Sequence, residues 1–351
     1  MNEKMLAAML YGPKDLRLEE IADPVITENE VLLEVKKAAI CGTDVRMFNN
    51  GYAGISSATP RILGHEMAGV IKQVGKNVKK YEPGMRVTVA PNMGCGMCRQ
   101  CVSGNTHLCK EYQALGINIH GGFTQYVKIP ESAVRQGNIC ALADHVSFEE
   151  AALVEPLACV YNGFLKVDIK PGDHVLIIGA GPIGLMHAKL AKMAGASKVI
   201  MNDISEERMA MCRQIDDFII TVASDDLRNY VADITNGEGV EVVITACPVP
   251  QVQASSLELV AMNGRINFFG GLPKEKEIVP LNTNLIHYKQ VIVTGSTRSS
   301  ILQYIQALDF VKHGLVDVKS LISANFSLDQ INNAFDHATR GIGLKNVISI
   351  G

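Results

Sequence analysis

The feature that most constrains the fold is the segment at 173–203, DHVLIIGAGPIGLMHAKLAKMAGASKVIMND. It starts with an apolar run of strand length and passes through a glycine turn into a stretch with apolar residues at helical spacing. A second short apolar run ends at Asp203. A buried strand, a helix and another buried strand, in that order, are typical of a parallel sheet with helices on its faces.

The glycine turn of this segment, GAGPIG, has the pattern G-x-G-x-x-G. Such glycines permit a tight turn, the approach of a pyrophosphate and close packing of helix on strand, while the start of the helix offers free N–H groups to phosphate. Asp203 stands where a carboxylate binds the ribose hydroxyls of NAD, and its charge would repel the 2′-phosphate of NADP. The turn therefore predicts an NAD-binding domain.

The residues expected to contact NAD are Gly179, Gly181, Pro182, Ile183, Gly184, Asp203 and Arg208. Two alternatives stay open at this point. The turn could belong to a Rossmann-like domain that binds nothing, and Arg208 could be solvated instead of touching the adenosine ribose.

The two sides of this segment differ in pattern. Before it, from residue 5 to about 148, short alternating runs broken by Gly and Pro predict strands, most clearly at 30–40, 67–75 and 85–91. After it, the predicted order is a helix at 204–214 opened by Ser205, strands at 217–221 and 241–247, a helix at 252–262 and a strand at 264–271. We therefore expect an α/β protein with a β-rich domain and a doubly wound parallel-sheet domain.

Four cysteines lie close together at the spacing C-x2-C-x2-C-x7-C: Cys95, Cys98, Cys101 and Cys109. Thiolates are favoured ligands of zinc, and a structural zinc takes four protein ligands. A four-cysteine iron-sulfur site is the rival, but there the fourth cysteine follows sooner and precedes a proline, whereas Lys110 follows Cys109. Nine cysteines, an odd number, in a long chain without a secretion signal also speak against a disulfide framework. The spacing predicts a structural zinc loop.

A second set of metal-binding residue types is spread over the first 160 residues. CGTD brings Cys41, Thr43 and Asp44 together, GHE contains His65 and Glu66, and Glu155 precedes a proline in AALVEPLACV. Taken singly, a cysteine or histidine is usually a packed core residue. Together they offer one thiolate, one imidazole and carboxylates, the donor mixture of open catalytic zinc sites.

The charge distribution limits the classes of molecule that the chain is expected to bind. The chain has 33 Lys and Arg against 36 Asp and Glu, without a long run of one sign, so it shows no footprint for nucleic acid or membrane. A small-molecule substrate is the better expectation. The N-terminal sequence lacks the apolar core of a signal peptide and no window is long enough to span a membrane, which predicts a cytoplasmic protein.

These motifs together resemble the zinc-dependent medium-chain dehydrogenase/reductase family over essentially the whole chain. GHEMAGVIKQVG is similar to the zinc signature of that family, the four-cysteine loop to its structural-zinc lobe and GAGPIG to its cofactor turn. CGTD, Glu155-Pro156, Arg298 in TGSTRSS and GIGLKNVI are most similar to its sorbitol (polyol) dehydrogenase branch. The resemblance implies a GroES-like catalytic domain at 1–150 and 288–351, with the strand VIVTGS and a helix at 301–314 in its return, and a Rossmann domain at 151–287.

The same resemblance implies roles for individual residues. Cys41, His65 and Glu66 would bind a catalytic zinc, with Glu155 either a fourth ligand or the holder of a zinc-bound water. Thr43 would accept the alcohol proton, Asp44 would orient a ligand, and Arg298 would face the substrate. The implied reaction is zinc-assisted oxidation of a polyol to a ketose by NAD, in a homodimer or homotetramer paired through the edge of the Rossmann sheet.

One position departs from the pattern of the family. Arg46 stands where relatives often have the histidine at the outer end of a proton relay. Arginine is permanently charged and binds phosphate readily, so Arg46, together with Arg298, could recognise a polyol phosphate, or Arg46 could lie at the rim without a role. An L-threonine 3-dehydrogenase, a simple alcohol dehydrogenase and a non-enzymatic NAD-binding regulator are the further alternatives.

Overall fold

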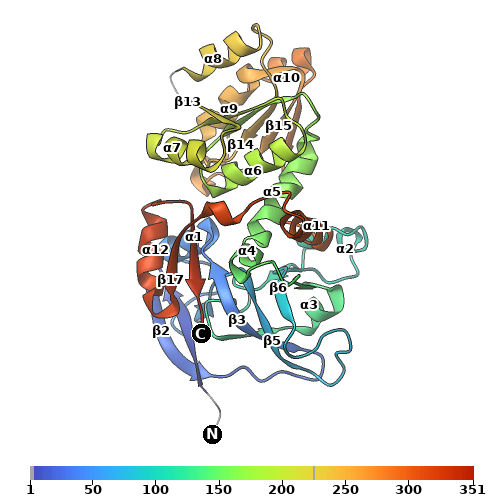
Figure 1. The fold of residues 1–351 in the computed structure, drawn as a ribbon, viewed down its shortest axis with the longest axis vertical. Helices are drawn as coiled ribbons and strands as arrows, with labels where there is room; N and C mark the ends of the chain where they lie inside the picture. Colours follow the sequence, from blue (N-terminus) through green and yellow to red (C-terminus); the bar gives the residue numbers. More distant parts are fainter. Residues whose placement is uncertain (1–3, 224–225) are drawn as a thin grey trace. The chain divides into compact units, whose positions relative to one another are not determined.

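The computed structural model describes residues 4–223 and 226–351, in two compact units (Figure 1). Unit 1 contains the chain up to Ala158, together with 298–314 and 318–351. Unit 2 contains residues 159–297 and 315–317. In the part of the chain that the structure describes, no helix is long and apolar enough to cross a membrane.

Unit 1 is built mainly from antiparallel strands. Its largest sheet has the order β10-β6-β5-β3-β18-β17, with β9 also paired to β3, and two smaller sheets have the orders β2-β1-β4 and β7-β8. The strands are β1 Lys4–Gly12, β2 Asp15–Ala22, β3 Val31–Ala39, β4 Arg61–Ile62, β5 Glu66–Val74, β6 Arg86–Val89, β7 Asn92–Met93, β8 Gln113–Ala114, β9 Tyr126–Ile129, β10 Ile139–Ala141, β17 Ile322–Ser327 and β18 Lys345–Ser349.

Short helices close the edges and loops of unit 1. They are α1 Gly42–Asn50, α2 Arg99–Val102, α3 Glu131–Gln136, α4 Phe148–Ala152, α11 Ile301–Lys312 and α12 Ile331–Thr339, with 3-10 turns η1 Thr106–Leu108, η3 Lys319–Leu321 and η4 Leu328–Gln330. The core packs aromatic side chains of distant segments together: Phe123 and Phe335 are fully buried, with ring centroids 5.8 Å apart.

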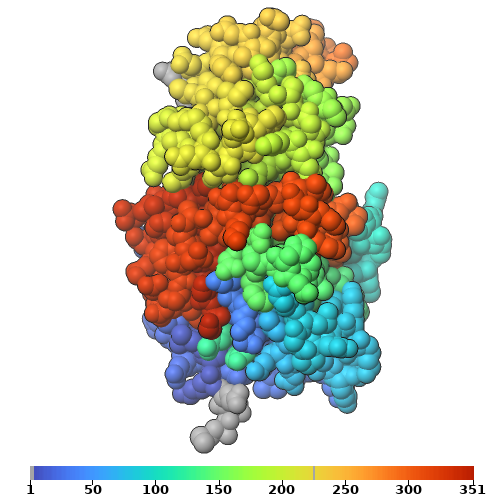
Figure 2. All heavy atoms as spheres, in the orientation of Figure 1, coloured from blue at the N-terminus to red at the C-terminus, as the bar shows by residue number. Residues whose placement is uncertain are grey.

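The C-terminal strand joins the sheet of the N-terminal part. Val347 of β18 pairs with Ala39 of β3, and on the other side of β3 the same Ala39 pairs with Glu66 of β5. The first and last thirds of unit 1 therefore lie against each other, as the blue and red atoms do in Figure 2. This register brings residues at the ends of β3, β5 and β18 together.

Unit 2 has the predicted doubly wound sheet. All six strands are parallel in the order β13-β12-β11-β14-β15-β16, so the strand order reverses beside β11, where dinucleotides bind in such sheets. The strands are β11 His174–Ile178, β12 Lys198–Asn202, β13 Ile219–Val222, β14 Val240–Thr245, β15 Val260–Phe268 and β16 Ile292–Gly295. The helices are α5 Val154–Val167, which begins in unit 1, α6 Pro182–Met193, α7 Glu206–Ile215, α8 Leu227–Ile234, α9 Pro250–Leu259 and α10 Thr283–Lys289, with the 3-10 turn η2 Lys274–Lys276.

Two details differ from the sequence-based expectation. The helix expected at 252–262 ends at Leu259, because Val260 already pairs with Val240 as the first residue of β15. The strand in VIVTGS is β16, which pairs with β15 at the edge of the Rossmann sheet and does not start the return to unit 1. The units consequently divide near 158 and 297 instead of at 150 and 288, and the first division falls inside the continuous helix α5.

A histidine buried in unit 2 should make the protein sensitive to acid. His187 is fully buried beside Phe269, neither ring nitrogen has a hydrogen-bond partner among the described residues, and burial lowers its pKa to about 3. As pH falls below 6.5 the unfolded chain gains a proton that the folded chain does not, so about 1.4 kcal/mol of stability is lost per pH unit. From pH 6.5 to 5 we therefore expect the thermal midpoint of the unaltered protein to fall several degrees more than that of His187→Leu.

The control for this measurement is the exposed His313, since His313→Gln should leave the acid sensitivity unchanged. Equal pH dependence of the unaltered protein and His187→Leu would contradict the account. The test uses the pH dependence, because the substitution itself also changes packing against Phe269.

Candidate active site and zinc-binding loop

The four cysteines of the 95–109 loop converge on one point in unit 1. The Sγ atom of Cys98 lies 3.6 Å from the Sγ of Cys101 and 3.8 Å from that of Cys109. The Sγ of Cys95 lies 4.0 Å from that of Cys101. A tetrahedron with 2.3 Å zinc–sulfur bonds has edges of about 3.8 Å, so the spacing fits a bound zinc. Backbone N–H groups of Met97 and then Cys98 also lower the pKa of Cys95 to about 7, which favours the thiolate that a metal requires.

A second cluster of three donors lies at the ends of β3 and β5. Cys41 follows β3 as the N-cap of α1, and His65 and Glu66 stand at the start of β5. One ligand atom of each residue lies within 4.8 Å of the other two. Because Ala39 pairs with Glu66, the register of β3 on β5 brings these segments together. A thiolate, an imidazole and a carboxylate make three protein ligands with an open position, the arrangement of catalytic zinc sites.

Asp44 holds two of the three donors in place. Its buried carboxylate accepts hydrogen bonds from the backbone N–H of Cys41 at 2.9 Å and of Gly64 at 3.3 Å, and it faces Nδ1 of His65 at 3.4 Å. Burial lowers the pKa of His65, but the charges of Asp44 and then Cys41 outweigh that effect and raise it well above its usual value. Zinc binds neutral imidazole, so metal binding would release this proton.

Lys345 is a residue of the site that the sequence analysis missed. Its buried Nζ donates to Oε2 of Glu66 and, at 3.0 Å, to the carbonyl of Ile40. Burial lowers the pKa of Lys345, but the charges of Glu66 and Cys41 outweigh this effect, so the pKa is raised overall and the ammonium form is maintained. The other oxygen of Glu66, Oε1, is buried with no hydrogen-bond partner among the described residues, which suits a metal ligand. In the sequence, the single lysine within the largely apolar segment LKNVISI could have indicated a buried, charge-paired side chain.

Glu155 and Thr43 lie in the same unit as the three-donor cluster. Glu155 is buried in the first turn of α5, outside the cluster, and its charge is one of those that raise the pKa of Lys345. The hydroxyl of Thr43 accepts a hydrogen bond from Nη2 of the exposed Arg46 at 3.1 Å. Arg46 is therefore close to the residue that was expected to receive the alcohol proton.

Arg298 contacts the zinc-binding loop. Its Nη1 donates to the carbonyl of His107 at 3.0 Å, and its guanidinium lies 3.9 Å from the centroid of the Tyr112 ring. Its backbone is in the left-handed region, with φ at 55°. Tyr112 in turn donates to Asn92 at 2.7 Å, and Asn92 donates to the carbonyl of Ser299. Arg298 thus anchors residues 298–299 to the segment that carries Cys109.

The glycine turn and Asp203 are joined in unit 2. Gly179 has φ at 118°, and a Cβ on Gly184 would overlap the carbonyl oxygen of Gly179, so both positions require glycine. The carboxylate of Asp203 accepts the N–H of Ala180 at 2.7 Å and that of Ser205 at 2.9 Å.

The start of helix α6 beyond this turn is open to a phosphate. The helix begins at Pro182 without a side-chain cap, so its first N–H groups are available to an anion. The Arg208 guanidinium lies near Gly181, beside the same turn. Pro182 and Ile183 form the first turn of the helix.

Comparison with known proteins finds matches for both the domain with the zinc clusters and the domain with the glycine turn. The profile of the alcohol dehydrogenase GroES-like domain matches residues 27–138, and that of zinc-binding dehydrogenases matches residues 182–313. The chain is 33% identical to sorbitol dehydrogenase of Bacillus subtilis over 339 residues, which are 96% of this chain and 94% of that enzyme. The chain belongs to the zinc-dependent medium-chain dehydrogenase family. It is accordingly a dehydrogenase that uses zinc and NAD or NADP.

Other members of the family are similar over comparable lengths. The chain is 32% identical to L-threonine 3-dehydrogenase of Bacillus velezensis over 328 residues, 92% of each protein. A zinc-binding dehydrogenase of Sinorhizobium meliloti, solved bound to NADP, shares 28% identity and superposes with a TM-score of 0.90 over 99% of both chains. The predicted family, the GroES-like and Rossmann fold class, the enzyme class and the cofactor classes are therefore confirmed, while the substrate is not determined by these relatives.

Proposed function

We propose that this medium-chain dehydrogenase oxidises a secondary hydroxyl of a polyol to a ketone, with NAD as the hydride acceptor and in the cytoplasm. The observation that carries the chemistry is the cluster of the half-buried Cys41 with the buried His65 and Glu66, with Oε1 of Glu66 left without a protein partner among the described residues. The similarity to sorbitol dehydrogenase supports a polyol as the substrate. Nine free cysteines are in keeping with a reducing compartment.

The residues divide the work of this reaction. Cys41, His65 and Glu66 would hold zinc, with Glu155 as a fourth ligand or as the holder of a water; when bound, zinc supplies Lewis acidity that lowers the pKa of the substrate hydroxyl. Thr43 takes the hydroxyl proton and passes its own proton on towards solvent, so that its hydroxyl is restored. Arg46 donates to Thr43 and is permanently charged, so it fixes the threonine hydroxyl without accepting the proton itself. NAD, which the glycine turn and Asp203 would hold, would supply the acceptor for the hydride of the carbinol carbon.

The test is NAD reduction by the zinc-loaded enzyme with sorbitol, xylitol, ribitol, arabitol, galactitol, several of their phosphates and L-threonine. We expect turnover of one or more polyols and at least about tenfold lower kcat/KM with L-threonine, which corresponds to 1.36 kcal/mol. Turnover of L-threonine alone would replace the proposed substrate by the one named for the Bacillus velezensis relative.

A polyol phosphate is the second candidate substrate, and the exposed Arg46 beside Thr43 favours it. A guanidinium binds phosphate through paired hydrogen bonds, which a neutral side chain cannot replace. Arg298 is the weaker candidate for this role, since it donates to His107 and stacks on Tyr112. If Arg46→Ala leaves the ratio of kcat/KM between a polyol and its phosphate unchanged, this candidate fails.

The preference for NAD over NADP should depend on Asp203. Its carboxylate follows β12 and is joined to the glycine turn, so its negative charge would meet a 2′-phosphate there. We expect Asp203→Ala to raise the ratio of NADP to NAD in kcat/KM by about 10-fold to 100-fold, because about 1.4 kcal/mol corresponds to each tenfold change. Asp226→Ala, at the start of α8, is the control. An unchanged ratio would assign the choice of cofactor to other residues, with Arg208 the first to test.

We also propose that two copies pair through the edge of the Rossmann sheet, as dimers or tetramers. The edge strand β16 exposes 56% of Ile292, and the neighbouring Tyr288 is 70% exposed. An exposed edge strand offers unpaired backbone groups to a second chain. Light scattering of the unaltered protein and of Ile292→Lys tests this pairing, and a monomeric unaltered protein would exclude it.

A further inference from the structure

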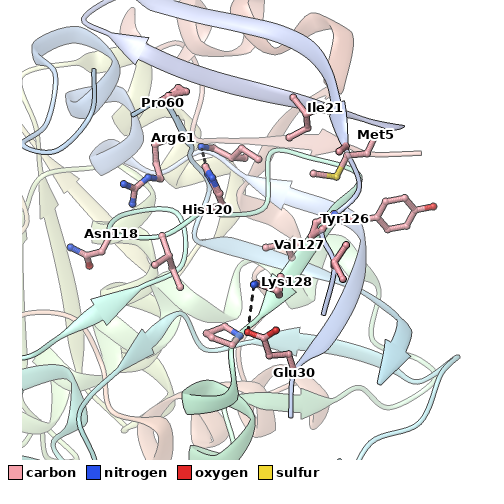
Figure 3. Close-up of a pocket in the computed structure, with 16 residues that line it drawn as sticks. Met5, Ile21, Glu30, Pro60, Arg61, Asn118, His120, Tyr126, Val127 and Lys128 are labelled. Carbon is pink, nitrogen blue, oxygen red and sulfur yellow. Dashed lines mark hydrogen bonds and ion pairs between the residues drawn. The ribbon is translucent and has the colours of Figure 1, made fainter. Parts of the chain in front are cut away.

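A cavity in unit 1 shares no residue with either zinc cluster (Figure 3). It has a volume of about 670 Å³, within the range of small-molecule sites. Its walls come from β1, β2, β4 and β9 and from the loop that carries His120. Met5, Ile62 and Val127 give it a buried apolar lining. The family comparison and the proposed reaction leave this cavity without a role.

Two basic side chains meet at one end of this cavity. Arg61 and His120 lie beside each other in Figure 3, and both line the cavity. The Arg61 guanidinium makes a long hydrogen bond, from Nη1 to the carbonyl of Ile117 at 3.4 Å. A half-buried guanidinium has five N–H donors to satisfy, so most of this donor capacity faces the cavity or solvent.

His120 adds a further donor beside Arg61. Its Nδ1 accepts the backbone N–H of Ile62 at 3.1 Å, so in the neutral ring the proton is on Nε2. Partial desolvation first, and then the positive charge of Arg61, lower the pKa of the solvent-accessible His120, and desolvation likewise lowers that of the half-buried Arg61. At neutral pH His120 is therefore a neutral N–H donor, and Arg61 carries the positive charge that an anion would compensate.

The other charged pair of the cavity is already balanced. Nζ of Lys128 lies 3.6 Å from Oε1 of Glu30, and Figure 3 shows this ion pair apart from Arg61 and His120. The uncompensated positive charge of the cavity is therefore at the Arg61 end, next to the apolar lining.

We propose that this cavity binds a small organic anion, a carboxylate with an apolar tail. The carboxylate accepts hydrogen bonds from the fork of Arg61 and from Nε2 of His120, and the apolar tail packs on the partly exposed Ile21 and Ile119 of the lining. The site is independent of the polyol chemistry, so its test does not depend on whether the proposed function is correct.

The test uses octanoate as the probe on zinc-loaded, NADH-saturated protein labelled with carbon-13 at the methionine methyl groups. Met5 lines the cavity, whereas Met67 follows the metal-binding Glu66 in sequence, so the two methyl signals distinguish the two places where a carboxylate could bind. Met5→Leu and Met67→Leu assign the signals. We expect octanoate to shift the Met5 signal saturably and to leave that of Met67 in place, and octanamide, which lacks the charge, to bind at least about tenfold more weakly.

Variants identify the groups that bind the anion. Arg61→Gln should weaken octanoate binding at least about tenfold, since a charge-assisted bidentate contact is lost. His120→Asp should abolish it without loss of thermal stability, because the new carboxylate can still accept the Ile62 N–H and supplies Arg61 with an internal partner. Lys79→Gln, which removes an exposed lysine outside the cavity, should bind as the unaltered protein does.

Three results would overturn the proposal. These are a shift of Met67 without Met5, equal binding of octanoate and octanamide, and unchanged affinity in both Arg61→Gln and His120→Asp.

Discussion

Replacing Cys41 with alanine is expected to lower kcat/KM by at least about 10³-fold and to reduce the zinc content from two ions per chain to one. The substitution removes the thiolate of a three-donor cluster, and Lewis-acid stabilisation by a bound zinc is worth several kcal/mol. The four-cysteine loop uses other residues, so its zinc should remain. Metal analysis and steady-state kinetics on the same preparation measure both effects.

The matched control for this experiment is Cys159→Ser, which changes a half-buried thiol outside both cysteine clusters. NADH binding, followed by the fluorescence of the nucleotide, should be similar in the control and in Cys41→Ala, because the glycine turn lies in unit 2. Retention of two zinc ions and more than a tenth of the activity by Cys41→Ala would contradict the assignment of Cys41 as a ligand.

Features that are local in sequence were predictable. The glycine turn, Asp203 and the helix opened by Ser205 all lie within one strand–helix–strand unit and the helix that follows it, and the four loop cysteines lie within fifteen residues. Ser205 does cap α7, since its side chain accepts the N–H of Arg208. In each case the spacing along the chain already determines which groups can meet.

Contacts made by distant strands were not predictable in the same way. Lys345 reaches Glu66 only because β18 adds to β3 beside β5, and nothing in the local sequence specifies that register. Arg298 was expected to face the substrate, yet it donates to the carbonyl of His107 and stacks on Tyr112, close to the zinc-binding loop. The position of an arginine in a motif does not specify which of several neighbours its long side chain will contact.

The grouping of Cys41, His65 and Glu66 was expected from chemistry and from family resemblance. Spacing could not derive it, because Cys41 and His65 are 24 positions apart in the sequence and the pairing of β3 with β5 brings them together. Asp44 is a second example of a contact that spacing does not reveal. Its nearness to Cys41 was evident from the sequence, but the hydrogen bond that it accepts from Gly64 and its approach to His65 depend on the folded loop.

The buried pair of Lys345 and Glu66 leads to the second large effect, a loss of stability in Lys345→Met. Both side chains are almost inaccessible, and removal of one partner of a buried ion pair costs about 3–5 kcal/mol because the other charge is left uncompensated. A zinc ion on Glu66 would compensate that charge. The loss should therefore be largest in the Cys41→Ala background, in which we expect the catalytic zinc to be absent, and smaller in the zinc-loaded protein with Cys41 intact.

A double-variant comparison separates the charge effect from a packing effect. In the Cys41→Ala background, adding Glu66→Gln to Lys345→Met should restore most of the lost stability, because the uncompensated carboxylate is gone while the methionine remains. Thermal unfolding followed by circular dichroism measures the midpoints, and a loss of 3–5 kcal/mol corresponds to roughly 6 °C or more for a unit of this size. If the double variant is no more stable than Lys345→Met alone, the loss comes from packing, and Lys345 does not act by neutralising Glu66.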